Sequence, residues 1–139
     1  DADRTMAALA EPAGRFRVRR VRSLPDALAL LATQPFDCVL ADLSLPHADD
    51  LQILDVLRER YGDTAVLVLS GRDEAQLAVQ AIQRGADDYL LKRETSPRQL
   101  HQSIAHAVER RASRVALRRV SARAATVMAA LADRVIGAA

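Results

Sequence analysis

The chain has 139 residues, of which 50% are hydrophobic and only 3% aromatic. This size and composition predict one compact domain plus an extension, with a core of Leu, Val, Ile and Ala. The apolar runs are far shorter than the ~20 residues that span a bilayer. Cys38 is the single cysteine, which excludes an internal disulfide, and we expect a reducing, cytoplasmic setting.

Charge is unevenly distributed along the chain. The net charge of +2 combines a mildly acidic body with a basic end, because residues 110–139 carry seven arginines and one acidic residue. Of the 20 basic residues, only Lys92 is a lysine. A compact ammonium group could be required at that position, where an arginine would not substitute; a compositional accident is the alternative.

The first part of the chain predicts an edge strand, a helix and a buried strand. Residues 16–21 (FRVRRV) have the pattern of an exposed edge strand. Ser23 and Pro25 are typical of a helix start, and the helix continues through DALALLAT. Residues 36–41 (FDCVLA) are almost continuously apolar, as in a parallel strand buried on both faces.

The middle of the chain repeats this alternation. Residues 50–61 predict a helix that ends at Gly62, and residues 65–69 (AVLVL) predict a strand. A second helix over 73–84 ends at Gly85, and DYLL forms a third strand. We expect the two helices to bury Leu51, Leu54, Leu57, Leu77, Ala78, Ala81 and Ile82. The alternation predicts an α/β fold, a doubly wound parallel sheet with helices on both faces.

The last part of the chain predicts an extended C-terminal helix. Ser96 is a favourable N-cap with proline following at the first helical position, and no glycine or proline then occurs before Gly137. We expect one or two breaks in so long a helix. Its second half carries a heptad-like apolar stripe that is typical of a coiled coil, formed by Leu117, Val120, Ala124, Val127, Leu131 and Val135.

The three buried runs end in residues with complementary chemistry. Asp42, Ser70 and Lys92 follow the three runs in turn. The carboxyl ends of parallel strands form one edge of a sheet, where ligands bind. A carboxylate there can accept a phosphoryl group, while a hydroxyl and an ammonium bind its oxygens. The sequence therefore predicts a phosphoryl-transfer site.

These motifs resemble those of the receiver (CheY-like) domains of two-component response regulators. The matching stretches are VLADLSLP, VLVLSGRDEAQLAVQAIQRGADDYLLK and the helix from Ser96. Asp42 stands at the position of the phosphoacceptor, Lys92 at that of the family lysine, and Ser70 and Tyr89 at those of the switch pair. The resemblance covers about residues 16–110 and implies the flavodoxin-like receiver fold.

The resemblance also implies cofactor, partners and roles. Asp42, Lys92 and Ser70 would carry self-catalysed phosphoryl transfer and autodephosphorylation, so the domain is not a classical enzyme. Mg²⁺ would be held by Asp42, the backbone carbonyl of Ser44 and Asp1. The donor would be a histidine kinase or a phosphotransfer protein. A homodimer through the last strand and helix and the C-terminal helix is expected, with a downstream output domain possible.

The sequence departs from the family in three places. The strand that should precede DADRTMAALA is missing, so this end looks absent or truncated, and Asp3 fits a first-turn acid. Asp50 replaces a frequent glycine. Arg93 follows the lysine where many members have a cis-proline, so we expect a trans peptide there.

We expect a receiver domain over residues 1–110 and a helical extension over 111–139 that dimerises or signals. The main alternative is a pseudo-receiver, a dimerisation module that works without phosphorylation. A dehalogenase-type phosphatase is disfavoured because DLS lacks its second carboxylate. The basic tail could bind DNA or an anionic membrane, but it has no aromatic or turn motif of a DNA reader, so no direct nucleic-acid or membrane contact is predicted.

Overall fold

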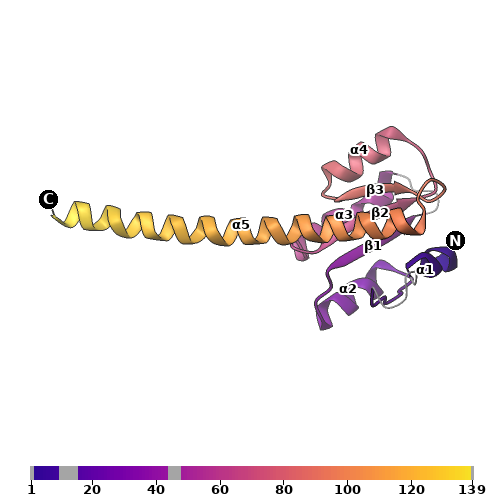
Figure 1. The fold of residues 1–139 in the computed structure, drawn as a ribbon, viewed down its shortest axis with the longest axis horizontal. Coiled ribbons are helices and arrows are strands. Elements are labelled where there is room, and N and C mark those ends of the chain that lie inside the picture. Colours follow the sequence, from indigo (N-terminus) through magenta and orange to yellow (C-terminus); the bar gives the residue numbers. More distant parts are fainter. Residues whose placement is uncertain (1, 10–15, 44–47, 139) are drawn as a thin grey trace.

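The computed structural model describes residues 2–9, 16–43 and 48–138, with the side chains of residues 5–9, 16–43 and 49–118. Figure 1 shows a small α/β body from which one long helix projects. The elements, in chain order, are α1 (Ala2–Leu9), α2 (Leu24–Thr33), β1 (Cys38–Leu43), η1 (Ala48–Leu51), α3 (Gln52–Arg60), β2 (Ala65–Ser70), α4 (Ala75–Gln83), β3 (Asp88–Leu91) and α5 (Pro97–Ala138).

The described strands form one parallel sheet in the order β1-β2-β3. All six residues of β2 are buried, because this strand lies between two neighbours and between two helical layers. The continuous apolar pattern of 65–69 predicted this position. The carboxyl ends of the strands lie at one edge of the sheet, as expected.

Helices cover both faces of the sheet, which confirms the two-layered covering expected from the sequence. One face packs against α2, α3 and α4, through a core that contains Leu31, Leu54, Leu57, Val66, Val68, Leu77 and Ala81. The other face packs against α1 and α5, through Leu9, Ala65, Leu67, Leu100, Ile104 and Ala107. Alternate residues of β2 therefore belong to opposite cores.

Local signals in the sequence account for the helix ends. The Ser23 side chain accepts a hydrogen bond from the Asp26 backbone N–H at 3.3 Å and caps α2. At the start of α5, the Ser96 side chain accepts from the Gln99 N–H at 3.1 Å and the Gln99 side chain accepts from the Ser96 N–H at 2.8 Å. This reciprocal pair is a capping box.

Three expectations about the fold are wrong. Residues 16–21 form no strand: within the described chain, no strand neighbours the outer edge of β1, and an extended segment without a ladder partner is not held as sheet. Ile82 is 49% exposed, since it faces away from the sheet. The C-terminal helix has no break and runs for 42 residues.

A charged cluster lies at the opposite edge of the sheet, near the amino ends of the strands. The Asp87 carboxylate is 3% exposed, and its two oxygens pair with Arg58 of α3 at 3.0 Å and Arg111 of α5 at 2.8 Å. It also accepts the Val66 backbone N–H at 2.8 Å. Burial lowers the pKa of Arg58, and the nearby Arg111 adds to that effect. The cluster joins both helical layers to the sheet.

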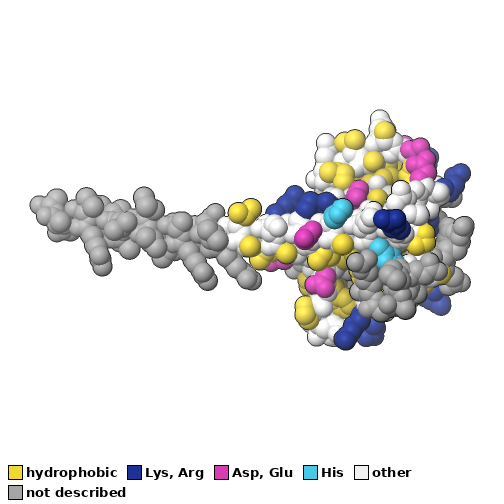
Figure 2. Space-filling model, in the orientation of Figure 1, with side chains coloured by type: hydrophobic (Ala, Val, Ile, Leu, Met, Phe, Trp, Pro, Cys, Tyr) yellow, Lys and Arg dark blue, Asp and Glu magenta, His cyan; other side chains and the backbone are white. Residues whose placement is uncertain are grey.

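The long helix α5 packs on the sheet through its first turns and then leaves the body (Figure 1). Its last described contact with the body is an ion pair between Arg118 and Asp63. Figure 2 shows basic side chains along α5 near the point where it leaves. No helix in the described part of the chain is long and apolar enough to span a membrane.

Candidate functional site

The carboxyl edge of the sheet brings Asp42 and Lys92 together. Asp42 is the penultimate residue of β1, and Lys92 directly follows β3. Although β2 lies between their strands, the Lys92 Nζ forms an ion pair with the Asp42 Oδ1. The two side chains are 12% and 21% exposed, so the pair is partly shielded from water and still reachable from outside.

A third side chain of this site comes from α1. The Thr5 hydroxyl donates a hydrogen bond to the Asp42 Oδ2 at 3.0 Å. Each carboxylate oxygen therefore has a different partner, an ammonium on one side and a hydroxyl on the other. Sequence reasoning missed Thr5, because nothing in DADRTMAALA distinguishes it from any other residue on a short amphipathic helix.

Ser70 lies at the same edge but on the other face of the sheet. In the ladder, Asp42 is paired with Leu69, and Ser70 with Leu43, so the side chains of Asp42 and Ser70 leave opposite faces. Ser70 is fully buried, and its Oγ accepts the Arg72 backbone N–H at 3.0 Å. We expected Asp42, Ser70 and Lys92 to meet. Asp42 and Lys92 are in direct contact, whereas the Ser70 side chain lies on the other face of the sheet.

Tyr89 contacts Ser70, the residue with which the family resemblance pairs it as a switch. Its hydroxyl lies 2.9 Å from the Ser70 Oγ and 2.9 Å from the Arg72 carbonyl oxygen. The carbonyl can only accept, so the Tyr89 hydroxyl can donate to it while accepting from Ser70, or donate to Ser70 directly. Either arrangement holds the tyrosine ring on the α4 side of the sheet, in contact with that core.

The expected magnesium site is only partly within the described residues. Asp1 and Ser44 lie outside them. The described residues contain no group of three or more His, Cys, Asp or Glu side chains placed to hold a metal ion. Among the described residues, Asp42 supplies an oxygen ligand of the kind that Mg²⁺ prefers, and Mg²⁺ commonly binds through one or two carboxylates. The donor present is therefore compatible with the ion.

Other residues considered from the sequence have structural roles. Arg72 pairs with Glu74 at 3.0 Å on the surface. His101 is buried, and its Nε2 donates to the Ala8 carbonyl oxygen at 2.7 Å. Burial, with Asp87 and Asp37 nearby, raises the pKa of the Cys38 thiol to about 12, so this cysteine is not a nucleophile at neutral pH.

The comparison with protein families decides the assignment. The model of the "Response regulator receiver domain" matches residues 2–105. The chain belongs to the response regulator receiver domain family. The α1 helix falls inside the matched range, so the receiver domain begins before the stretch from which the sequence resemblance was drawn.

Relatives and solved structures agree with this assignment. The receiver domain is 43% identical over 65 residues to the transcriptional regulatory protein QseB of Haemophilus influenzae, covering 47% of this chain and 29% of that protein. It resembles the beryllofluoride-activated NtrC4 receiver domain dimer (25% identity, TM-score 0.69, 80% of this chain and 92% of that chain). A Burkholderia pseudomallei response regulator with a phosphorylated aspartic acid is also similar. It has 26% identity and a TM-score of 0.60, and the match covers 84% of this chain and 69% of that chain.

The chain spans well under two thirds of the length of the first curated relatives that it matches, since the matched shares of those proteins run from 15% to 41%. Their remaining parts have no counterpart in the alignment. The activities of the complete relatives therefore belong to those proteins. The receiver domain is the part that this chain shares with them.

Proposed function

We propose that Asp42 accepts a phosphoryl group from a histidine kinase or phosphotransfer protein, and that the resulting acyl phosphate changes an interaction surface. The observation that carries the proposal is the Lys92–Asp42 ion pair at the carboxyl edge of the sheet. An ammonium fixed beside a partly exposed carboxylate can stabilise charge on the oxygens of an incoming phosphoryl group. The phosphorylated aspartic acid of the Burkholderia relative supports the same chemistry.

The proposed transfer uses the side chains of Asp42 and Lys92. An Asp42 oxygen forms a bond to phosphorus while the bond from phosphorus to the donor's imidazole nitrogen breaks, and the nitrogen keeps the electron pair. Lys92 lies beside the carboxylate and can follow the negative charge onto the phosphoryl oxygens. Mg²⁺ would be held by Asp42, the backbone carbonyl of Ser44 and Asp1, and would neutralise part of the same charge.

The proposed switch follows from the hydrogen bonds of Ser70. A phosphoryl group on Asp42 offers strong charged acceptors, so the Ser70 hydroxyl gains a partner beyond the end of β2. Its bond to Tyr89 then weakens, and the tyrosine ring is released to shift. Because the side chains of Ser70 and Asp42 leave opposite faces of the sheet, the carboxyl end of β2 must move for this contact to form.

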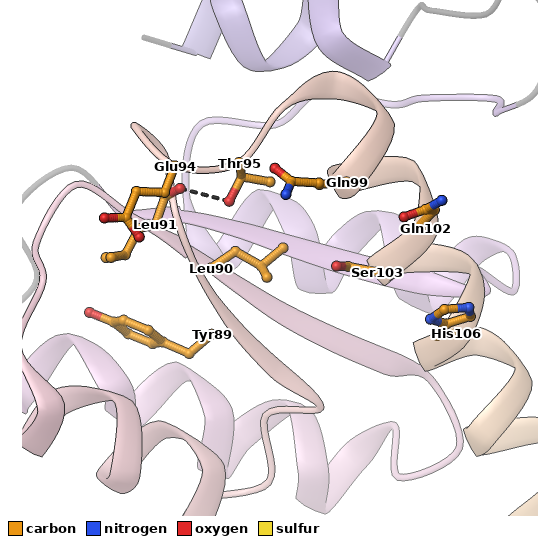
Figure 3. A pocket seen from close by; sticks show the side chains of 9 residues that line it. All are labelled: Tyr89, Leu90, Leu91, Glu94, Thr95, Gln99, Gln102, Ser103 and His106. Atoms are coloured by element: carbon orange, nitrogen blue, oxygen red, sulfur yellow. Dashed lines mark hydrogen bonds between the residues drawn. The ribbon is translucent and has the colours of Figure 1, made fainter.

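The surface that would respond lies between β3 and α5. A cavity of about 410 Å³ opens there next to Tyr89 (Figure 3). Polar side chains from the first three turns of α5 line one side, and β3 lines the other. We propose this face, with α5, as the surface for homodimerisation or a downstream partner. It is lined by Tyr89, Leu90, Leu91, Glu94, Thr95, Gln99, Gln102, Ser103 and His106.

Acetyl phosphate with MgCl₂, followed by intact-mass measurement, tests the acceptor. We expect one added phosphoryl group on the wild-type chain and none on Asp42→Asn. Asp49→Asn, which removes an exposed carboxylate nearby in the chain, should leave the modification in place. An unmodified wild-type chain would favour the alternative, a pseudo-receiver that dimerises without phosphorylation.

A further inference from the structure

We propose that Thr5 is a positioning residue for Asp42, and that its hydrogen bond couples helix α1 to the phosphorylation state of the acceptor. The inference rests on the proposed function and extends it to an element outside the Ser70–Tyr89 pair. Its basis is the 3.0 Å hydrogen bond from the Thr5 hydroxyl to the Asp42 Oδ2, in a partly buried setting.

The hydrogen bond favours the unphosphorylated acceptor. Hydrogen bonds to a charged acceptor are roughly twice as strong as those to a neutral one. When acetyl phosphate is the donor, an Asp42 oxygen bonds to phosphorus, the bond from phosphorus to the acetate oxygen breaks, and acetate leaves with the electron pair. The product is an acyl phosphate, in which the negative charge lies on the phosphoryl oxygens and the remaining Asp42 oxygen is a neutral carbonyl. Thr5 therefore stabilises Asp42 before transfer more than after it.

Among its described residues, α1 contacts the body at this bond and at a second place. The second is at the end of the helix, where Leu9 is buried against the α5 core and His101 of α5 donates to the Ala8 carbonyl oxygen at 2.7 Å. Thr5 thus links the acceptor to a helix whose other end rests on α5.

Two substitutions at Thr5 separate the hydroxyl from the shape of the side chain. Thr5→Val removes the hydroxyl and keeps the volume, whereas Thr5→Ser keeps the hydroxyl. Thr33→Val is the matched control, because the Thr33 hydroxyl donates to the Leu30 carbonyl of its own helix. Each variant is phosphorylated with acetyl phosphate and MgCl₂, and the rate constant is followed by intact mass.

We expect Thr5→Val to be phosphorylated roughly three- to tenfold faster than wild type, the range that the loss of one modest hydrogen bond gives. Thr5→Ser and Thr33→Val should stay within about twofold of wild type on the same grounds. An equal or slower rate for Thr5→Val, or the same rate change in Thr5→Ser, would overturn the proposal.

Amide hydrogen exchange over residues 2–9 gives a readout that does not need phosphoryl transfer. Unmodified Thr5→Val should exchange faster there than unmodified wild type, and phosphorylation should raise exchange in wild type more than in the variant. Unchanged exchange in unmodified Thr5→Val would refute the attachment. If the wild-type chain takes no phosphoryl group, the proposed function fails, and the unmodified comparison still decides the role of Thr5.

Discussion

The two oxygens of the Asp42 carboxylate have different neighbours, and this asymmetry is the central feature of the site at the scale of single residues. Lys92 pairs with one oxygen and Thr5 donates to the other. In the proposed transfer, the lysine acts as a compact point charge on a flexible side chain that can move with the phosphoryl group. The threonine hydroxyl is fixed on a helix, so its contact depends on where α1 lies.

Gly85 is the other residue whose identity the local geometry requires. It ends the turn after α4 with a φ of +105°, and a Cβ there would lie 2.5 Å from the Arg58 Cγ. Gly85→Ala should lower the free energy of unfolding by at least ~1–2 kcal/mol, because the backbone conformation is strained for any L-residue with a side chain. Urea unfolding measures the change.

Gly62→Ala is the control for that substitution. Gly62 has no positive φ, and a Cβ would meet only the Arg58 carbonyl oxygen at 3.4 Å, an ordinary contact. The free energy of unfolding should stay the same or rise by up to ~1 kcal/mol, because alanine restricts the unfolded chain. Equal losses in the two variants would show that the conformation of Gly85 is not special.

At the scale of elements, Asp87 joins α3, β2 and α5 through one carboxylate. Its partners Arg58 and Arg111 are 15% and 14% exposed, so removing the negative charge leaves two poorly solvated guanidinium groups. Asp87→Asn keeps an acceptor for the Val66 N–H but loses both ion pairs. We expect it to lower the free energy of unfolding by roughly 3–5 kcal/mol, as is typical when one partner of a buried pair is removed.

Asp55→Asn provides the matched surface comparison. Asp55 pairs with Arg84 at 3.4 Å, and the two side chains are 59% and 35% exposed. Exposed pairs contribute about 0–1 kcal/mol, so urea unfolding of this variant should nearly coincide with that of wild type. If Asp87→Asn were as mild as Asp55→Asn, the cluster would not be what holds α5 against the amino edge of the sheet.

At the scale of the whole molecule, the dominant feature is the length of α5 that extends past the body (Figure 1). Leu117 is 66% exposed on this helix and begins the apolar stripe that the sequence continues to Val135. A projecting helix with one apolar stripe is best stabilised by a partner helix. We therefore propose that two copies of the chain associate along α5.

Sedimentation velocity over a range of concentrations tests this association. We expect a dimer for the wild-type chain and a monomer for Leu117→Asp/Leu131→Asp, because charges in the stripe cannot be buried against a partner. Ala122 and Ala129 lie outside the apolar stripe in the sequence pattern, so Ala122→Asp/Ala129→Asp should remain dimeric. A monomeric wild type, or loss of the dimer in both double variants, would contradict a coiled-coil contact.

The periodicity of the sequence by itself determined the three described strands, the helices between them and the order of Asp42, Ser70 and Lys92 along one edge. These features follow from short-range patterns, since continuous apolar runs mark the strands and caps mark helix ends. Of the described strands, β2 is fully buried as expected, whereas most residues of β1 and β3 are only half-buried. The capping box at Ser96 and the turn at Gly85 are examples that the chain carries locally.

Only the tertiary structure decided which of these side chains meet. The Thr5–Asp42 bond joins residues 37 positions apart, and the face from which Ser70 leaves depends on the strand register. The unbroken α5 and the lack of a strand at residues 16–21 were also settled at this level, because a helix gains from packing and a strand needs a neighbour's ladder. Contacts between distant segments leave no trace in local periodicity. Those contacts nevertheless decide which side chains surround the Asp42 carboxylate.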